Sequence, residues 1–249
     1  MVKISVVSYL NSKPFLYGLN HFSEFENHSI SLDIPSVCAK KLLHNEVDLG
    51  LIPVAIIPLL KESHIISDFC IGADGPVDSV MLYSQVPLDE IKSVFLDYQS
   101  RTSVNLVRVL AKKFWNINPK WIQANEGYEK NIDGVNAGVV IGDRAFDLNN
   151  KFTYVYDLAD EWKKFTNLPF VFACWVSNKK LDKDFLDVFN KALNYGVSNI
   201  DLVLDNIDNR GISRNTLEHY FKKNISYRLS DDKHKALDLF LNFIKSDLD

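Results

Sequence analysis

Strand-like and helix-like segments alternate along the chain, and this alternation starts twice. Segments 3–9, 30–36 and 47–54 have the character of strands, helix-like segments separate them, and the alternation begins again with a strand-like segment at 93–98. Segment 47–54 is apolar almost throughout, which is typical of a parallel strand that is buried on both faces. A strongly apolar segment at 168–177 is followed by an almost wholly helical pattern. This order predicts an α/β protein of two lobes with a ligand cleft between them.

We expect the chain to cross between these lobes near residues 85–90 and again near 170–177. Residues 1–87 and 173–249, which include the C-terminal helices, then form the first lobe, and residues 88–172 form the second. A chain of 249 residues is long enough to bury a sizeable core within such an arrangement.

The composition argues against several classes of protein. The net charge is −4 and basic residues are not clustered, so binding to nucleic acid is not expected. No run of about 18 apolar residues is present, and segment 1–7 has the character of a strand and not of a secretory signal. We therefore expect a protein of the cytoplasm that does not bind membranes.

Neither the cysteines nor the histidines are spaced like metal ligands. Cys38, Cys70 and Cys174 are isolated and odd in number, which favours free thiols in a reducing compartment over a disulfide framework. The 6 histidines are scattered, with no two of them spaced to share one turn of a helix. No metal site is therefore expected.

Polar residues follow four of the predicted strands at the points where the strands end. The four clusters are Ser8-Tyr9-Leu10-Asn11, Asp78-Ser79, Ser100-Arg101-Thr102-Ser103 and Gly142-Asp143. In an open α/β sheet, ligands bind beyond the carboxyl ends of the strands. The clusters therefore predict a site for a small polar ligand.

The third cluster lies at the start of a predicted helix. The hydroxyls of Ser100, Thr102 and Ser103, the free backbone N–H groups and the helix dipole all favour an anion there, and Arg101 adds a positive charge. Ordinary capping of the helix by one Ser or Thr explains the same pattern equally well.

The first cluster has two interpretations as well. As part of a ligand site, Asn11 both donates and accepts hydrogen bonds, and Tyr9 forms a wall for an apolar ring. Alternatively, the cluster is an ordinary polar connection between a strand and a helix.

Six stretches of the sequence carry a resemblance to a known family. In order, they are SYLNSKPF, DLGLIPV, GADGPVDSVMLYSQVPLD, SRTSVNLVRVLA, VVIGDRAF and YDLADEWKKFTNLPFVFACWV. Together they resemble the chorismate dehydratases of menaquinone biosynthesis over roughly residues 1–180, and LPFVFA followed by Trp175 is the most specific part. The C-terminal helices match only in character.

This resemblance implies a type II periplasmic-binding-protein fold that serves as a cytoplasmic enzyme. The implied reaction is a carbon–oxygen lyase step of the futalosine pathway, in which chorismate loses water to give 3-[(1-carboxyvinyl)oxy]benzoate. Removal of the C3 proton and the C4 hydroxyl makes the ring aromatic, so the reaction requires positioning and proton transfer. Neither a cofactor nor a metal is expected.

The resemblance also implies which residues form the site. It places Asn11 and Ser79 there as catalytic residues. Asn11 is expected to bond the ring hydroxyl or an adjacent carboxylate, and Ser79 to donate to the developing charge or to the leaving hydroxyl. The strand-end clusters, and not the resemblance, supply the further residues expected to bind substrate, which are Ser8, Tyr9, Ser100, Arg101, Thr102, Ser103, Gly142 and Asp143.

The group that accepts the proton stays open between two alternatives. Asp143 is the one carboxylate that the motifs place near the cleft, although it also suits a structural role across its turn. Alternatively, the enolpyruvyl carboxylate of the substrate takes the proton itself.

Two other functions are compatible with the fold that the resemblance implies. A binding or sensor protein for small carboxylates is disfavoured because neither an export signal nor a DNA-binding segment precedes the first predicted strand. The sister enzyme of the futalosine pathway is disfavoured because no histidine lies in a matching motif. The sequence does not indicate an oligomeric state.

Overall fold

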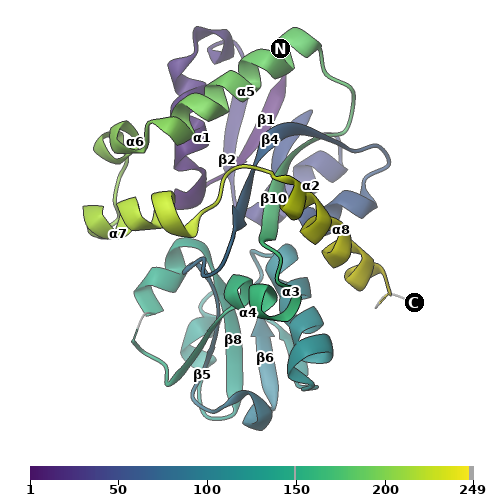
Figure 1. The fold of residues 1–249 in the computed structure, drawn as a ribbon, viewed down its shortest axis with the longest axis vertical. Helices are drawn as coiled ribbons and strands as arrows, with labels where there is room; N and C mark the ends of the chain where they lie inside the picture. The colour runs from purple at the N-terminus through teal and green to yellow at the C-terminus, as the bar shows by residue number, and fades with distance from the viewer. Residues whose placement is uncertain (149, 247–249) are drawn as a thin grey trace.

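The computed structural model describes residues 1–148 and 150–246. These residues are organised around two five-stranded sheets (Figure 1). The strands of the first sheet are β1 (Lys3–Val7), β2 (Ser29–Asp33), β3 (Leu49–Pro53), β4 (His64–Ala73) and β10 (Phe170–Ser177). Those of the second sheet are β5 (Val80–Ser84), β6 (Ser93–Leu96), β7 (Lys120–Gln123), β8 (Asn136–Ile141) and β9 (Tyr154–Asp157). The strand orders are β2-β1-β3-β10-β4 and β7-β6-β8-β5-β9.

Both sheets are mixed. In the first sheet, β1 pairs parallel with β2 and β3, whereas β10 runs antiparallel to β3 and β4. The second sheet repeats this plan, because β6 is parallel to β7 and β8 while β5 is antiparallel to β8 and β9. All five residues of β3 are buried, which confirms that this strand is covered on both faces.

The chain changes sheet earlier than the crossings predicted from the sequence. β5 pairs with β8 and β9 in the second sheet, so the change falls between β4 and β5. The return falls before β10, whose first residue Phe170 already pairs with Ala73 of β4. The apolar pattern of residues 80–84 identifies a strand but does not say which sheet the strand joins. The division into lobes at 87/88 and 172/173 itself stays a prediction.

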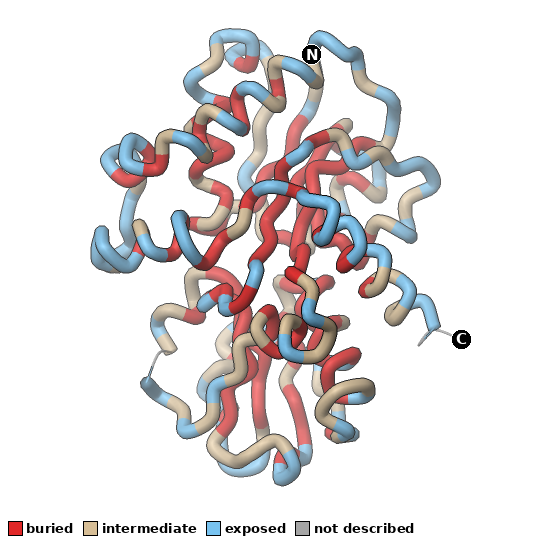
Figure 2. The backbone as a smooth tube through the Cα atoms, in the orientation of Figure 1, coloured by how far each residue is buried: buried red, intermediate tan, exposed pale blue. Residues whose placement is uncertain are grey.

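Helices cover the sheets and join their strands. They are α1 (Lys13–His21), α2 (Pro35–Leu43), α3 (Thr102–Leu110), α4 (Leu158–Thr166), α5 (Lys183–Ser198), α6 (Ile200–Asn206), α7 (Arg214–His219) and α8 (Asp231–Ser246). Within the described part of the chain, no helix is long and apolar enough to cross a membrane. The buried strands form the centre of each lobe (Figure 2), and buried residues of both lobes belong to one continuous apolar core.

The C-terminal helices return to the first lobe and to the junction between the lobes (Figure 1). The segment after α7 runs beside β4, where Ser226 N donates to Gly72 O at 2.8 Å and Cys70 N donates to Tyr227 O at 2.7 Å. This pairing fixes the position of the residues between α7 and α8. It brings the segment with Ser226 and Tyr227, which lies more than 200 residues after the start of the chain, to the edge of the cleft.

Candidate active site between the two lobes

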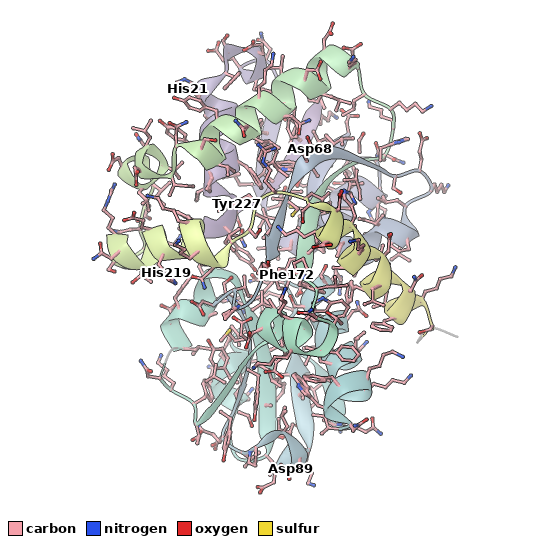
Figure 3. The ribbon with its side chains drawn as sticks, in the orientation of Figure 1. His21, Asp68, Asp89, Phe172, His219 and Tyr227 are labelled. Atoms are coloured by element: carbon pink, nitrogen blue, oxygen red, sulfur yellow. The ribbon has the colours of Figure 1, made fainter. Side chains whose placement is uncertain are left out.

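A pocket lies where strand ends of the two sheets meet. Its apolar walls include Pro35 and Pro53 from the first lobe and Phe172 from β10. Figure 3 shows Phe172 at the junction between the lobes. Apolar walls that carry a few polar groups are typical of a binding site for a small molecule.

Most residues that the sequence predicts for the site line this pocket. They are Tyr9, Asn11, Ser79, Ser100, Thr102, Ser103 and Gly142. Among the described residues, the other three predicted residues lie outside its lining. Ser8 donates its backbone N–H to Asp33 O at 2.9 Å, and Arg101 is exposed. The Asp143 carboxylate bonds to other groups, described below.

Ser79 precedes β5, and its side chain is buried. Tyr220 OH donates a hydrogen bond to Ser79 Oγ at 2.8 Å. The loop before Ser79 is held by Asp157, whose Oδ2 accepts the N–H groups of Val77 and Asp78 at 2.7 Å each. Burial raises the pKa of Asp157 to about 6, although these N–H groups lower it. The position of the Ser79 hydroxyl is therefore fixed from two sides.

Asn11 lies in the short turn between β1 and α1. Its side-chain Oδ1 is buried and has no hydrogen-bond partner among the described residues. Its backbone oxygen accepts a hydrogen bond from Tyr227 OH at 3.0 Å, which anchors the turn. Because an unpaired buried acceptor costs about 1–3 kcal/mol, a ligand that donates a hydrogen bond to Asn11 Oδ1 is favoured here.

The start of α3 combines helix capping with free hydroxyl groups. Ser100 Oγ accepts the backbone N–H of Ser103 at 2.9 Å, so part of this cluster does cap the helix. Thr102 Oγ1 donates to Phe172 O at 2.9 Å and accepts from Ala55 N at 3.3 Å, which links the two lobes. Among the described residues, the hydroxyl hydrogen of Ser100 and the Ser103 hydroxyl have no hydrogen-bond partner, so a ligand in the pocket can use them.

Tyr9 lines the pocket, and its position requires the absence of a side chain at Gly142. Tyr9 OH donates to Gln99 Oε1 across the junction, and burial raises the pKa of this hydroxyl so that it stays protonated. A Cβ on Gly142 would lie 2.7 Å from Tyr9 Cε2, and the φ of Gly142 is +68°. Both the close approach and the left-handed backbone require glycine at this position.

The Asp143 carboxylate joins the lobes from outside the pocket. Its Oδ1 accepts the backbone N–H of Leu10 at 3.0 Å, and its Oδ2 accepts from Arg210 at 2.7 Å. Burial raises the pKa of Asp143, while the Leu10 N–H and the Arg210 charge lower it. Because both oxygens already have partners, this geometry favours the structural alternative for Asp143 over the role of proton acceptor.

Tyr220 does not line the pocket but contacts it through Ser79, and the sequence does not indicate this contact. It lies in a helical turn at Tyr220–Asn224 that directly follows α7, next to His219, which Figure 3 shows near the junction. In the sequence it belongs to an ordinary amphipathic pattern, 141 positions after Ser79. No local signal distinguishes such a tyrosine from one that only packs in the core.

Sequence comparison identifies one family and a curated relative. A family model described as menaquinone biosynthesis matches residues 2–246. A protein of Thermus thermophilus named chorismate dehydratase is 28% identical over 255 residues, and the match covers 93% of this chain and 91% of that protein.

Solved structures of several proteins share the fold. A protein of Archaeoglobus fulgidus has a TM-score of 0.76 at 12% identity, with 99% of this chain and 97% of that chain covered. A Candida albicans protein described as having the generic periplasmic binding protein fold has a TM-score of 0.62 at 14% identity, with 100% and 94% covered. The predicted two-lobed, periplasmic-binding-protein-like fold is thereby confirmed.

Proposed function

The chain belongs to the menaquinone-biosynthesis family, and from this premise we propose that it is a chorismate dehydratase. The reaction converts chorismate to 3-[(1-carboxyvinyl)oxy]benzoate and water. The relative from Thermus thermophilus that carries this name aligns with 93% of the chain. Chorismate is a small dicarboxylate with a ring hydroxyl, and the pocket has polar groups that suit the hydroxyl and one carboxylate.

The observation that carries the proposal is a donor and an unpaired acceptor in one largely apolar pocket. Ser79 supplies the donor, and Asn11 Oδ1 supplies a buried acceptor that has no partner in the described part of the chain. A hydroxyl group both donates and accepts hydrogen bonds. The C4 hydroxyl of chorismate can therefore donate to Asn11 Oδ1 and accept from Ser79. The second bond strengthens as negative charge develops on the leaving oxygen, which favours the transition state.

The carboxylates of the substrate require further donors, and the start of α3 supplies them. The hydroxyls of Ser100 and Ser103 line the pocket there. The N-terminal end of the α3 dipole adds to the attraction for an anion. Within the described residues, no Lys or Arg side chain lines the pocket. We therefore assign the binding of one carboxylate to these neutral groups.

The elimination itself breaks two bonds of the ring. The C3–H bond breaks and its electron pair forms the new C3–C4 double bond as the C4–O bond breaks. The proton that leaves C3 is passed on to the departing hydroxide, so that water leaves and the group that accepted the proton is restored. The enolpyruvyl carboxylate of the substrate accepts the C3 proton in this proposal. The two hydrogen bonds of Asp143, to Leu10 N and Arg210, support this choice because they occupy the alternative base.

Asp143→Asn is expected to keep kcat within about tenfold of the wild-type value, because the amide retains one acceptor and the side chain does not receive the proton. Steady-state kinetics with chorismate measures the effect, with thermal melting as the check on folding. A loss of about four orders of magnitude in a folded variant would assign the base to Asp143 instead.

The proposed function is tested by incubating the purified protein with chorismate and following the product by liquid chromatography with mass detection. Formation of 3-[(1-carboxyvinyl)oxy]benzoate far above the spontaneous rate is expected. Tight binding of chorismate without product would indicate a sensor protein of the same fold. Turnover of the later futalosine-derived substrate alone would indicate the sister enzyme.

We also propose that the reaction takes place in the cytoplasm. Cys38, Cys70 and Cys174 are all buried free thiols, and free thiols are typical of a reducing compartment. Fractionation of cells that contain the protein, followed by immunodetection, tests this location. Recovery in the periplasmic or extracellular fraction would contradict it.

A further inference from the structure

Tyr220 is a buried tyrosine that reaches the candidate site from the C-terminal helices. Only 1% of its surface is exposed, and its hydroxyl lies 2.8 Å from Ser79 Oγ. Its ring packs edge-on against Phe146 of the second lobe, with the ring centroids 5.1 Å apart. In the same turn, Asn224 Nδ2 donates to Pro76 O at 3.1 Å, on the loop that leads to Ser79. Tyr220 is thus tied to the segment that carries Ser79.

We propose that Tyr220 is a positioning residue for the dehydration, which directs the only hydroxyl hydrogen of Ser79 toward the substrate. This inference rests on the proposed function. A serine hydroxyl has one hydrogen and two lone pairs. Because Tyr220 OH donates to Ser79 Oγ, it occupies one lone pair and leaves the hydrogen of Ser79 for another acceptor. Ser79 lines the pocket, so a substrate oxygen is the acceptor in reach.

The same phenol also interacts with the other proposed catalytic residue. Burial raises the pKa of Tyr220, and its interactions with the side chains of Ser79 and Asn11 oppose this effect without outweighing it. The hydroxyl therefore stays protonated at neutral pH and remains a donor. In a chain of hydrogen bonds, each donor polarises the next. Donation from Tyr220 thus makes Ser79 a stronger donor to the oxygen that leaves.

The first part of the test compares Tyr220→Phe with Tyr83→Phe. Tyr83 is also fully buried and also donates its hydroxyl hydrogen, in this case to Ala145 O at 2.9 Å outside the pocket lining. We expect Tyr220→Phe to lower kcat for chorismate about 10- to 100-fold, with KM changed less than about twofold. Tyr83→Phe is expected to leave both parameters near wild type. An unchanged kcat in Tyr220→Phe overturns the proposal.

The second part is a double-mutant cycle, which separates action through Ser79 from a general structural effect. When Tyr220→Phe is added to Ser79→Ala, we expect kcat to change by less than about twofold. A further loss as large as that in the wild-type background overturns the proposal. If Tyr220→Phe does not fold, 3-fluorotyrosine at position 220 keeps the hydroxyl as a stronger donor. It is then expected to raise kcat about twofold or more, and an unchanged kcat overturns the proposal.

Turnover of chorismate by the wild-type protein is measured first, so that the two proposals fail in different ways. Absence of turnover by the wild type contradicts the proposed function and the role of Tyr220 with it. Turnover by the wild type, together with an unaffected Tyr220→Phe variant, overturns the role of Tyr220 alone.

Discussion

Ser79→Ala is expected to lower kcat for chorismate about 100- to 1000-fold, because it removes a fixed donor to the leaving oxygen. Tyr220 and the loop held by Asp157 fix the position of this hydroxyl before the substrate binds. Its hydrogen bond therefore requires little reorganisation in the transition state. KM is expected to change much less than kcat, since the bond is strongest when charge has developed on the oxygen. Steady-state kinetics measures both parameters.

Ser93→Ala is the matched control for this substitution. Ser93 is also a buried serine with a side-chain hydrogen-bond partner, since its hydroxyl donates to Asn136 Oδ1, but it lies outside the lining of the pocket. We expect Ser93→Ala to keep wild-type kinetics. A folded Ser79→Ala variant with kcat within about threefold of wild type would contradict the role of Ser79.

Gly196→Ala is expected to lower the free energy of unfolding by about 3 kcal/mol, at the upper end of the range for overpacking. A Cβ on Gly196 of α5 would lie 1.7 Å from Pro14 O of α1, and a Cβ on Gly18 would lie 1.9 Å from Ala192 O. The obstructing atoms belong to the backbone, so a change of side-chain rotamer does not relieve the contact. Urea denaturation, read as the shift of the midpoint at constant slope, measures the loss.

Lys191→Ala is the control on the same helix, because Lys191 is exposed. Its expected effect is within about 0.5 kcal/mol. If the free energy of unfolding of Gly196→Ala falls by less than about 1 kcal/mol, α1 and α5 can move apart with little loss of stability, which would contradict this prediction. This contact also bears on the site, since α1 directly follows the turn that carries Asn11.

The sequence is sufficient to predict the order of strands and helices and the two-lobed fold class. The apolar runs that become β1, β3 and β10 are recognisable because burial on both faces requires continuous apolar residues. The pairing of the strands is not recognisable in the same way. β10 inserts antiparallel between β3 and β4, and β5 joins the second sheet, through contacts between distant segments. Such contacts leave no local pattern.

The same distinction applies to the candidate site. Asn11 follows β1, so the rule that ligands bind at strand ends places it near the pocket that it lines. Ser79 also lines the pocket, but it directly precedes β5 and does not end a strand, so its predicted place at a strand end is wrong. The rule does not give the direction of a side chain, which is why Arg101 and Asp143 lie outside that lining. Tyr220 reaches Ser79 only through the return of the C-terminal helices, and no strand end precedes it.

A crystal structure of Ser79→Ala with chorismate bound tests the central claim most directly, because the expected loss of turnover preserves the substrate. We expect the C4 hydroxyl within hydrogen-bond distance of Asn11 Oδ1 and facing the position of the missing Ser79 hydroxyl. One carboxylate is expected at the start of α3, beside Ser100 and Ser103. Chorismate bound outside this pocket, or with its C4 hydroxyl against the apolar wall of Pro35 and Pro53, would contradict the proposed mechanism.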